Sequence, residues 1–90
     1  MIEILRDRVI VYLGFPDGFP GSLTEFLDYI TSEILRHHHP DMVEIRGDAP
    51  SKVIALLAAN LTRYFSTIAV DGTVVYVSDP YAPFDVGDQI

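Results

Sequence analysis

The chain has 90 residues, 49% of them hydrophobic and 21% charged, a balance typical of one globular domain over residues 1–90. With 13 acidic and 6 basic side chains the net charge is −7, which disfavours binding to long nucleic acids but still allows a small anionic ligand. The absence of cysteine excludes disulfides and thiol–metal sites. No apolar stretch approaches the roughly 20 residues of a membrane span, and the first residues lack a signal-peptide pattern, so we expect a cytoplasmic protein with no membrane partner.

The amino-terminal part of the chain predicts strand structure followed by a loop. The segments IEIL (2–5) and VIVYLG (9–14) flank a polar turn at 6–8, so they form either a short hairpin or one bent strand. Prolines and glycines within 15–21 then predict a loop.

Two helices are expected further along the chain. Ser22 followed by Glu25 has the spacing of a capping box and opens the first helix, which is expected to end in the histidines before Pro40. The second helix begins near Pro50, because proline is favoured in the first turn. Their apolar faces comprise Leu23, Phe26, Leu27, Ile30 and Ile34 in the first helix, and Val53, Ile54, Leu57, Leu61 and Tyr64 or Phe65 in the second.

The segment between the helices, 41–47, predicts a strand. Val43 and Ile45 would lie on one face of it, and Glu44 and Arg46 on the other.

The segment 66–77 predicts a β-hairpin, because Asp71-Gly72 suits a two-residue type I′ turn. The tail, 78–90, is expected to be mostly irregular. In the predicted register Val70 faces Thr73 and Ile68 faces Val75 on the core side, while Ala69 faces Val74 and Thr67 faces Tyr76 on the other side.

These elements predict an α+β fold in two layers. Two helices can cover only one face of a four- or five-stranded sheet, which would leave a second face bearing Ile10, Tyr12, Val74 and Tyr76. An apolar second face suggests burial against another copy, so we expect a homo-oligomer, either a dimer or a tetramer.

The junction between the strand at 41–47 and the second helix is the candidate binding site. Arg46 ends the strand, Gly47 precedes the helix and Lys52 lies in its first turn. The unpaired N–H groups and the dipole of a helix N-terminus attract anions, so this junction could hold one phosphate or carboxylate. Asp48 could instead cap the helix and accept the same amides. A tight structural connection is the alternative, since neither a P-loop nor a dinucleotide fingerprint is present.

Four motifs occur in a recognisable order: VEIRGDAPSKVIALLAANL, TIAVDG, TVVYVSD and VGDQI. Over residues 42–90 they resemble the small CRISPR-associated ring nucleases of type III systems, in which a strand ending in glycine, a helix opened by Gly-Pro, an Asp-containing strand and a closing Gly-Asp-Val-Ile follow one another. The resemblance implies a ferredoxin-like sandwich that oligomerises and takes part in antiviral defence. It further implies that a cyclic oligoadenylate or a similar small nucleotide binds at Arg46, Gly47, Ser51 and Lys52, across a subunit interface.

The catalytic positions of that family are altered in this chain. Asn60 stands at the position of the family's histidine and Asp71 at its aspartate, but the following Pro-Arg-Leu is absent and Asp79 replaces a second histidine. Asparagine cannot shuttle a proton near neutral pH, and the missing arginine removes a fork for phosphate oxygens. Asn60 and Asp71 are the candidate catalytic residues, although Asp71 is also what a type I′ turn favours. Whether the protein cleaves its ligand or only binds it stays open.

The alternative function is a non-catalytic homo-oligomeric module, structural or regulatory, that keeps the fold and binds a protein partner.

His37, His38 and His39 raise the question of a metal site. Consecutive helical residues point about 100° apart, so three in a row do not converge on one ion. Histidines at a helix C-terminus are also favoured by the dipole alone. We expect no metal and no cofactor, and the sequence does not assign these histidines a role.

Overall fold

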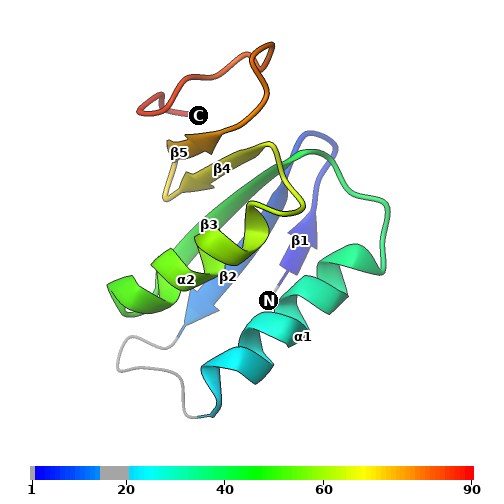
Figure 1. The fold of residues 1–90 in the computed structure, drawn as a ribbon, viewed down its shortest axis with the longest axis vertical. Helices are drawn as coiled ribbons and strands as arrows, with labels where there is room; N and C mark the ends of the chain where they lie inside the picture. Colours follow the sequence, from blue (N-terminus) through cyan, green and yellow to red (C-terminus); the bar gives the residue numbers. More distant parts are fainter. Residues whose placement is uncertain (1, 15–20) are drawn as a thin grey trace.

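The computed structural model describes residues 2–14 and 21–90 (Figure 1). One five-stranded sheet has the order β1-β2-β3-β4-β5. The three central strands are parallel, and the two edge strands run antiparallel to their neighbours. The elements are β1 (Ile2–Ile4), β2 (Val9–Gly14), α1 (Leu23–Leu35), β3 (Met42–Asp48), α2 (Ser51–Leu61), β4 (Thr67–Val70) and β5 (Thr73–Val77).

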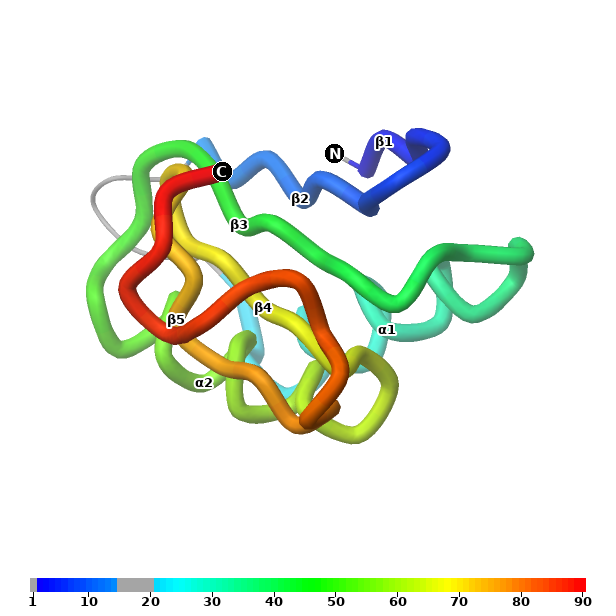
Figure 2. The backbone as a smooth tube through the Cα atoms, turned by 90° about the horizontal axis from the view of Figure 1, so that it is seen from above, coloured from blue at the N-terminus to red at the C-terminus, as the bar shows by residue number. Residues whose placement is uncertain are grey.

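The two helices are crossover connections between parallel strands. Helix α1 joins β2 to β3 and α2 joins β3 to β4, and both lie on the same side of the sheet (Figure 2). Both crossovers step in the same direction along the sheet, from β2 to β3 and from β3 to β4. Because crossovers between parallel strands share one hand, both helices must then lie on the same face. The predicted α+β fold with two helices on one face is confirmed, and its two layers are consistent with a ferredoxin-like sandwich. Neither helix is long and apolar enough to cross a membrane, within the residues described.

The main core lies between the sheet and the helices. The Ser22 hydroxyl accepts a hydrogen bond from the Glu25 N–H at 3.4 Å, so α1 begins where the capping box predicts. Phe65 is buried and Tyr64 is exposed, but both lie beyond the end of α2 at Leu61, so the expectation that the second helix includes them is wrong. The core cluster comprises Val9, Val11, Leu13, Phe26, Ile30, Ile34, Val43, Ile45, Leu57, Leu61, Phe65 and Ile68.

The first two strands form a hairpin rather than one bent strand. Ile2 pairs with Val11 and Ile4 with Val9, and the Leu5 N–H donates to the Arg8 carbonyl at 2.8 Å to close the turn. The loop predicted over 15–21 falls almost entirely outside the described residues.

The hairpin β4–β5 has the predicted turn but a different register beyond it. Asp71 and Gly72 have φ of 48° and 86°, as a type I′ turn requires. The predicted pairs of Ile68 with Val75 and of Thr67 with Tyr76 are wrong, because a β-bulge lies between Ile68 and Ala69. Ile68 pairs with Tyr76 and Thr67 with Val77, while Ala69–Val74 and Val70–Thr73 are as predicted. Tyr76 therefore packs against the helix-side core instead of the second face.

The tail covers part of the second face of the sheet. It runs beside β5 at the edge opposite β1 (Figure 1), where the Val74 N–H donates to the Asp88 carbonyl at 2.8 Å and the Ile90 N–H to the Gly72 carbonyl at 2.9 Å. Phe84 and Ile90 pack against Met42, Ala69 and Val74. This apolar part of the second face is thus buried by the chain itself, without a second copy.

Candidate functional site

The carboxyl ends of the parallel strands β2, β3 and β4 meet at one edge of the sheet. Gly14 ends β2 and is paired with Asp48 at the end of β3, and the Asp71 N–H, just after β4, donates to the Ile45 carbonyl at 2.9 Å. Helix α2 begins at the same edge, with Ser51. In proteins with parallel sheets, ligands characteristically bind just outside the carboxyl ends of the strands.

The N-terminus of α2 has no side-chain cap within residues 2–14 and 21–90. Pro50 is the N-cap residue, and its carbonyl accepts the N–H groups of Val53 at 2.9 Å and Ile54 at 3.2 Å. Asp48, which was expected to compete with an anion for these amides, does not cap the helix. Among the residues described, the N–H groups of Ser51 and Lys52 have no acceptor, and both residues are exposed. The backbone donors that an anion would use are therefore accessible.

Gly47 is required by packing whether or not a ligand binds. Its φ is 101°, a left-handed value that L side chains disfavour. A Cβ at this position would lie 2.0 Å from the carbonyl oxygen of Leu13 on the neighbouring strand β2. The tight structural connection considered for this glycine is therefore present, while Ser51 and Lys52 at the start of the adjacent helix are exposed.

Arg46 lies on the face of the sheet away from the helices, where it is paired with Glu44. Its Nε is 2.8 Å from Glu44 Oε2, and Arg8 Nη1 is 3.1 Å from Glu44 Oε1. The Glu44 side chain is 1% exposed and that of Arg46 43%. Burial raises the pKa of Glu44, but the hydrogen bonds and charges of Arg46 and Arg8 outweigh it, so the pKa lies below its ordinary value. Arg46 is thus held by a buried carboxylate and does not lie beside Lys52.

The two candidate catalytic residues lie at opposite ends of the domain. Asp71 is exposed at the carboxyl edge, in the turn after β4. Asn60 lies nine residues after Ser51, about 13 Å along the helix axis. Its Nδ2 donates to Thr31 Oγ1 at 2.7 Å and thereby joins α2 to α1. Within one chain the structure brings Asp71, but not Asn60, to the edge that holds Gly47, Ser51 and Lys52.

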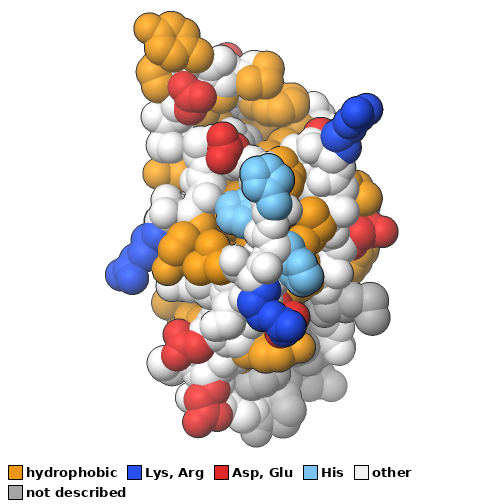
Figure 3. Space-filling view, turned by 90° about the vertical axis from the view of Figure 1, so that its right-hand side faces the viewer, with side chains coloured by type: hydrophobic (Ala, Val, Ile, Leu, Met, Phe, Trp, Pro, Cys, Tyr) orange, Lys and Arg blue, Asp and Glu red, His pale blue; other side chains and the backbone are white. Residues whose placement is uncertain are grey.

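The three histidines gather on one side of the molecule (Figure 3). Helix α1 ends at Leu35, so the expectation that they form its last residues is wrong, and they lie in the connection to β3. His39 Nδ1 is 2.9 Å from the Pro40 carbonyl oxygen, and its ring centroid is 4.8 Å from that of Phe65. In the described ranges no three metal-binding side chains of His, Cys, Asp or Glu come together. His39 packs as a structural residue.

Sequence reasoning missed the ion-pair network around Glu44. Its arginine partner Arg8 is 36 residues away in the sequence and reaches Glu44 only because β2 pairs with β3. The alternation of Glu44 with Val43 and Ile45 did indicate its face, but not that Glu44 would be buried within a single chain.

No family model, no curated protein and no solved structure matches this chain. The chemistry of the edge must therefore be derived from its residues. It offers backbone N–H groups and the ammonium of Lys52 to an anion, with the Asp71 carboxylate close to the same edge. All three histidines lie elsewhere, so this edge of one chain holds no imidazole for acid–base chemistry.

Proposed function

We propose that this is a divergent ring-nuclease-like protein that binds a cyclic oligoadenylate, or a similar small nucleotide, in CRISPR type III defence signalling. The observation that carries the proposal is the uncapped N-terminus of α2, where the Ser51 and Lys52 amides have no partner within the described residues. Free amides and the helix dipole at the carboxyl edge of parallel strands favour a phosphate group.

The charges of the molecule favour a small ligand over a long nucleic acid. The net charge of −7 repels an extended phosphate backbone, whereas the Lys52 ammonium and the helix N-terminus can attract a single phosphate group. Arg46 could contact the same ligand only from the other face of the sheet, in competition with Glu44. We therefore assign Gly47, Ser51 and Lys52 the main role in binding and Arg46 a smaller one.

Binding with weak or absent cleavage is the form of the activity that the residues favour. Of the two candidate catalytic side chains, Asp71 is the one that shares the edge. A carboxylate alone is a poor substitute for the histidine that acts as general acid or base in a histidine-dependent mechanism. Asn60 could join the site only from a neighbouring subunit, which the proposed homo-oligomer would have to supply. The proposal keeps the cytoplasmic location expected from the sequence.

Calorimetry with cyclic tetra-adenylate tests the proposal. Replacing Lys52 by alanine removes one exposed phosphate contact, so we expect the dissociation constant to rise about fivefold. Arg63→Ala is the matched control, because it removes one exposed positive charge just after the other end of α2. Arg46→Ala should have a smaller effect than Lys52→Ala.

Two results would contradict this function. Absence of heat with the unmutated protein would exclude nucleotide binding and favour the alternative, a structural or regulatory homo-oligomer that binds a protein. Equal weakening by Lys52→Ala and Arg63→Ala would show that the ligand responds to net charge rather than to this edge. If binding is found, an RNA-cleavage assay with and without manganese then separates an enzyme from a protein that only sequesters the nucleotide.

A further inference from the structure

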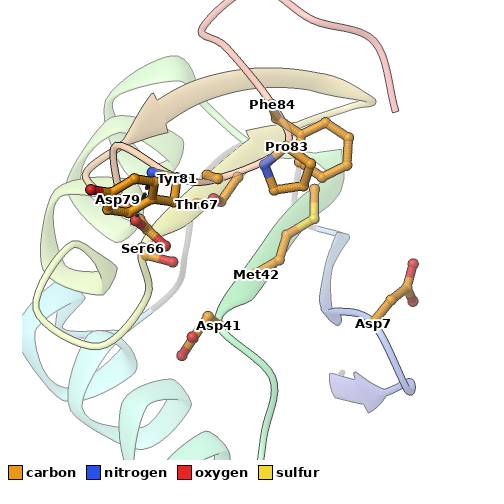
Figure 4. Close-up of a pocket in the computed structure, with 10 residues that line it drawn as sticks. Asp7, Asp41, Met42, Ser66, Thr67, Asp79, Tyr81, Pro83 and Phe84 are labelled. Carbon is orange, nitrogen blue, oxygen red and sulfur yellow. Dashed lines mark hydrogen bonds between the residues drawn. The ribbon is translucent and has the colours of Figure 1, made fainter.

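A hollow lies at the amino-terminal edge of the central strands, at the opposite end of the sheet from the proposed nucleotide site. Its volume is about 430 Å³. One wall comes from the starts of β3 and β4, and the other from the tail segment 79–84 (Figure 4). The residues that matter for its chemistry are Asp41, Met42, Thr67, Asp79, Tyr81 and Phe84.

One part of the hollow is apolar, and its tail wall is held in place. The Met42 side chain points toward Pro83 and Phe84 (Figure 4), and Met42 and Phe84 also belong to the second core cluster. Asp79 fixes the turn of the tail, because its Oδ1 accepts the Tyr81 N–H at 2.9 Å and its carbonyl accepts the Ala82 N–H at 3.1 Å. The hollow is therefore a formed feature, and its apolar part offers a surface on which a ligand could pack.

The charged side chains that line the hollow are all acidic: Asp7, Asp41 and Asp79. Asp7 is partly neutralised, since Arg8 Nη2 lies 3.2 Å from its Oδ2. The Asp41 carboxylate has no partner among the described residues, and no lysine, arginine or histidine lines the hollow there. Beside these carboxylates Tyr81 is 92% exposed, which is unusual for so large a ring.

We propose that this hollow binds a small organic cation, an amidinium, guanidinium or ammonium group carried on an apolar body. The apolar body would cover Met42 and Phe84, while the cation would lie between the Asp41 and Asp79 carboxylates. The exposed face of Tyr81 would add a cation–π contact. The carboxylates repel the phosphate groups of a nucleotide, so this site is separate in place and in chemistry from the proposed nucleotide site.

Three ligands of the same shape and different charge test the inference. Benzamidine, benzamide and benzoate carry the same ring with a positive, a zero and a negative charge at neutral pH. We expect benzamidine to shift the amide NMR signals of Thr67, Ala82 and Phe84 in a saturable titration, and to bind at least about fivefold more tightly than benzamide. Benzoate should not bind, and added salt should weaken the benzamidine complex.

Matched variants separate a site from general attraction to an acidic protein. Asp41→Asn should weaken benzamidine binding about fivefold, whereas Asp28→Asn, which removes the same charge from an exposed position on α1, should not. Tyr81→Ala removes an exposed ring without touching a core, so the fold should persist while binding weakens about threefold. The inference is overturned if the three ligands bind equally, if the shifted signals lie outside the hollow, or if Asp28→Asn weakens binding as much as Asp41→Asn.

Discussion

The carbonyl oxygen of Leu13 occupies the space in which a side chain on Gly47 would begin. A Cβ on Gly47 would lie 2.0 Å from that oxygen and 3.0 Å from the Leu13 carbonyl carbon. The two residues are register partners on β2 and β3, and Gly47 has a positive φ of 101°. The strand end next to the α2 N-terminus is therefore fixed by close backbone packing.

Replacing Gly47 by alanine should destabilise the protein strongly. The Cβ collides with backbone atoms that cannot rotate away, and its φ is strained, so we expect a loss of about 3 kcal/mol or more in the free energy of unfolding measured with urea. Gly14→Ala is the control, because a Cβ there meets nothing within 4 Å. Its effect should stay below about 1 kcal/mol, and equal losses in the two variants would refute this account of Gly47.

Glu44→Gln should destabilise the fold by leaving two arginines without their shared carboxylate. Breaking a buried ion pair costs about 3–5 kcal/mol, and because both guanidinium groups are partly exposed we expect about 2 kcal/mol. Glu33→Gln breaks the ion pair with Arg36 at 2.8 Å on the surface of α1 and should cost less than about 0.5 kcal/mol. Urea unfolding of both variants gives the comparison, and a cost for Glu44→Gln no larger than that for Glu33→Gln would contradict it.

The same carboxylate should make stability depend on acid pH. Because Arg46 and Arg8 outweigh the effect of burial, the pKa of Glu44 in the folded protein lies below its ordinary value of 4.5. The folded state then binds the proton more weakly than the unfolded state, so this stabilisation is complete above about pH 4.5 and is lost as the pH falls through the lower, folded-state pKa. The Tm difference between the unmutated protein and Glu44→Gln should shrink as the pH is lowered from 7 to 3. A constant difference would show that the pKa of Glu44 is the same in the folded and unfolded protein, and a growing difference would show that folding raises it; either result would contradict this account.

Asn60 should act as a contact between the helices. Its hydrogen bond to Thr31, at 2.7 Å, links α2 to α1, and removing it should cost about 1 kcal/mol. A double-mutant cycle with Asn60→Ala and Thr31→Ala should show that the two changes are not additive. We expect Asn60→Ala to leave cyclic tetra-adenylate binding unchanged. Loss of binding in a protein that remains folded would instead place Asn60 in a nucleotide site formed across a subunit interface.

The layers of the fold were predictable because they depend on local patterns. Alternation in β3, the apolar stripes of α1 and α2, the Ser22–Glu25 capping box and the Asp71-Gly72 turn each act within a few residues. The register beyond the turn was not predictable in the same way. A bulge shifts the pairing of Ile68 from Val75 to Tyr76, and the tail bonds to Val74 on this hairpin from more than ten residues away.

The candidate site was predictable where its residues are neighbours in the sequence. Gly47, Ser51 and Lys52 come to one edge because the end of β3 leads directly into α2, and Asp71 joins them because β4 runs parallel to β3. Strand alternation also predicted that Arg46 lies on the face opposite Val43 and Ile45. The site was not predictable where distant contacts decide, because Glu44 pairs with Arg8 from another strand and Asn60 bonds to Thr31 on the other helix.

The most direct test of the central claim is an amide NMR titration of the unmutated protein with cyclic tetra-adenylate. If the uncapped N-terminus of α2 is the binding site, the largest and saturable shifts will come from Gly47, Ser51 and Lys52, while the signals of Ser66 and Thr67 at the opposite edge will stay in place. If no signals shift, or if the shifted signals cluster away from residues 46–52, the protein does not bind a nucleotide at this edge.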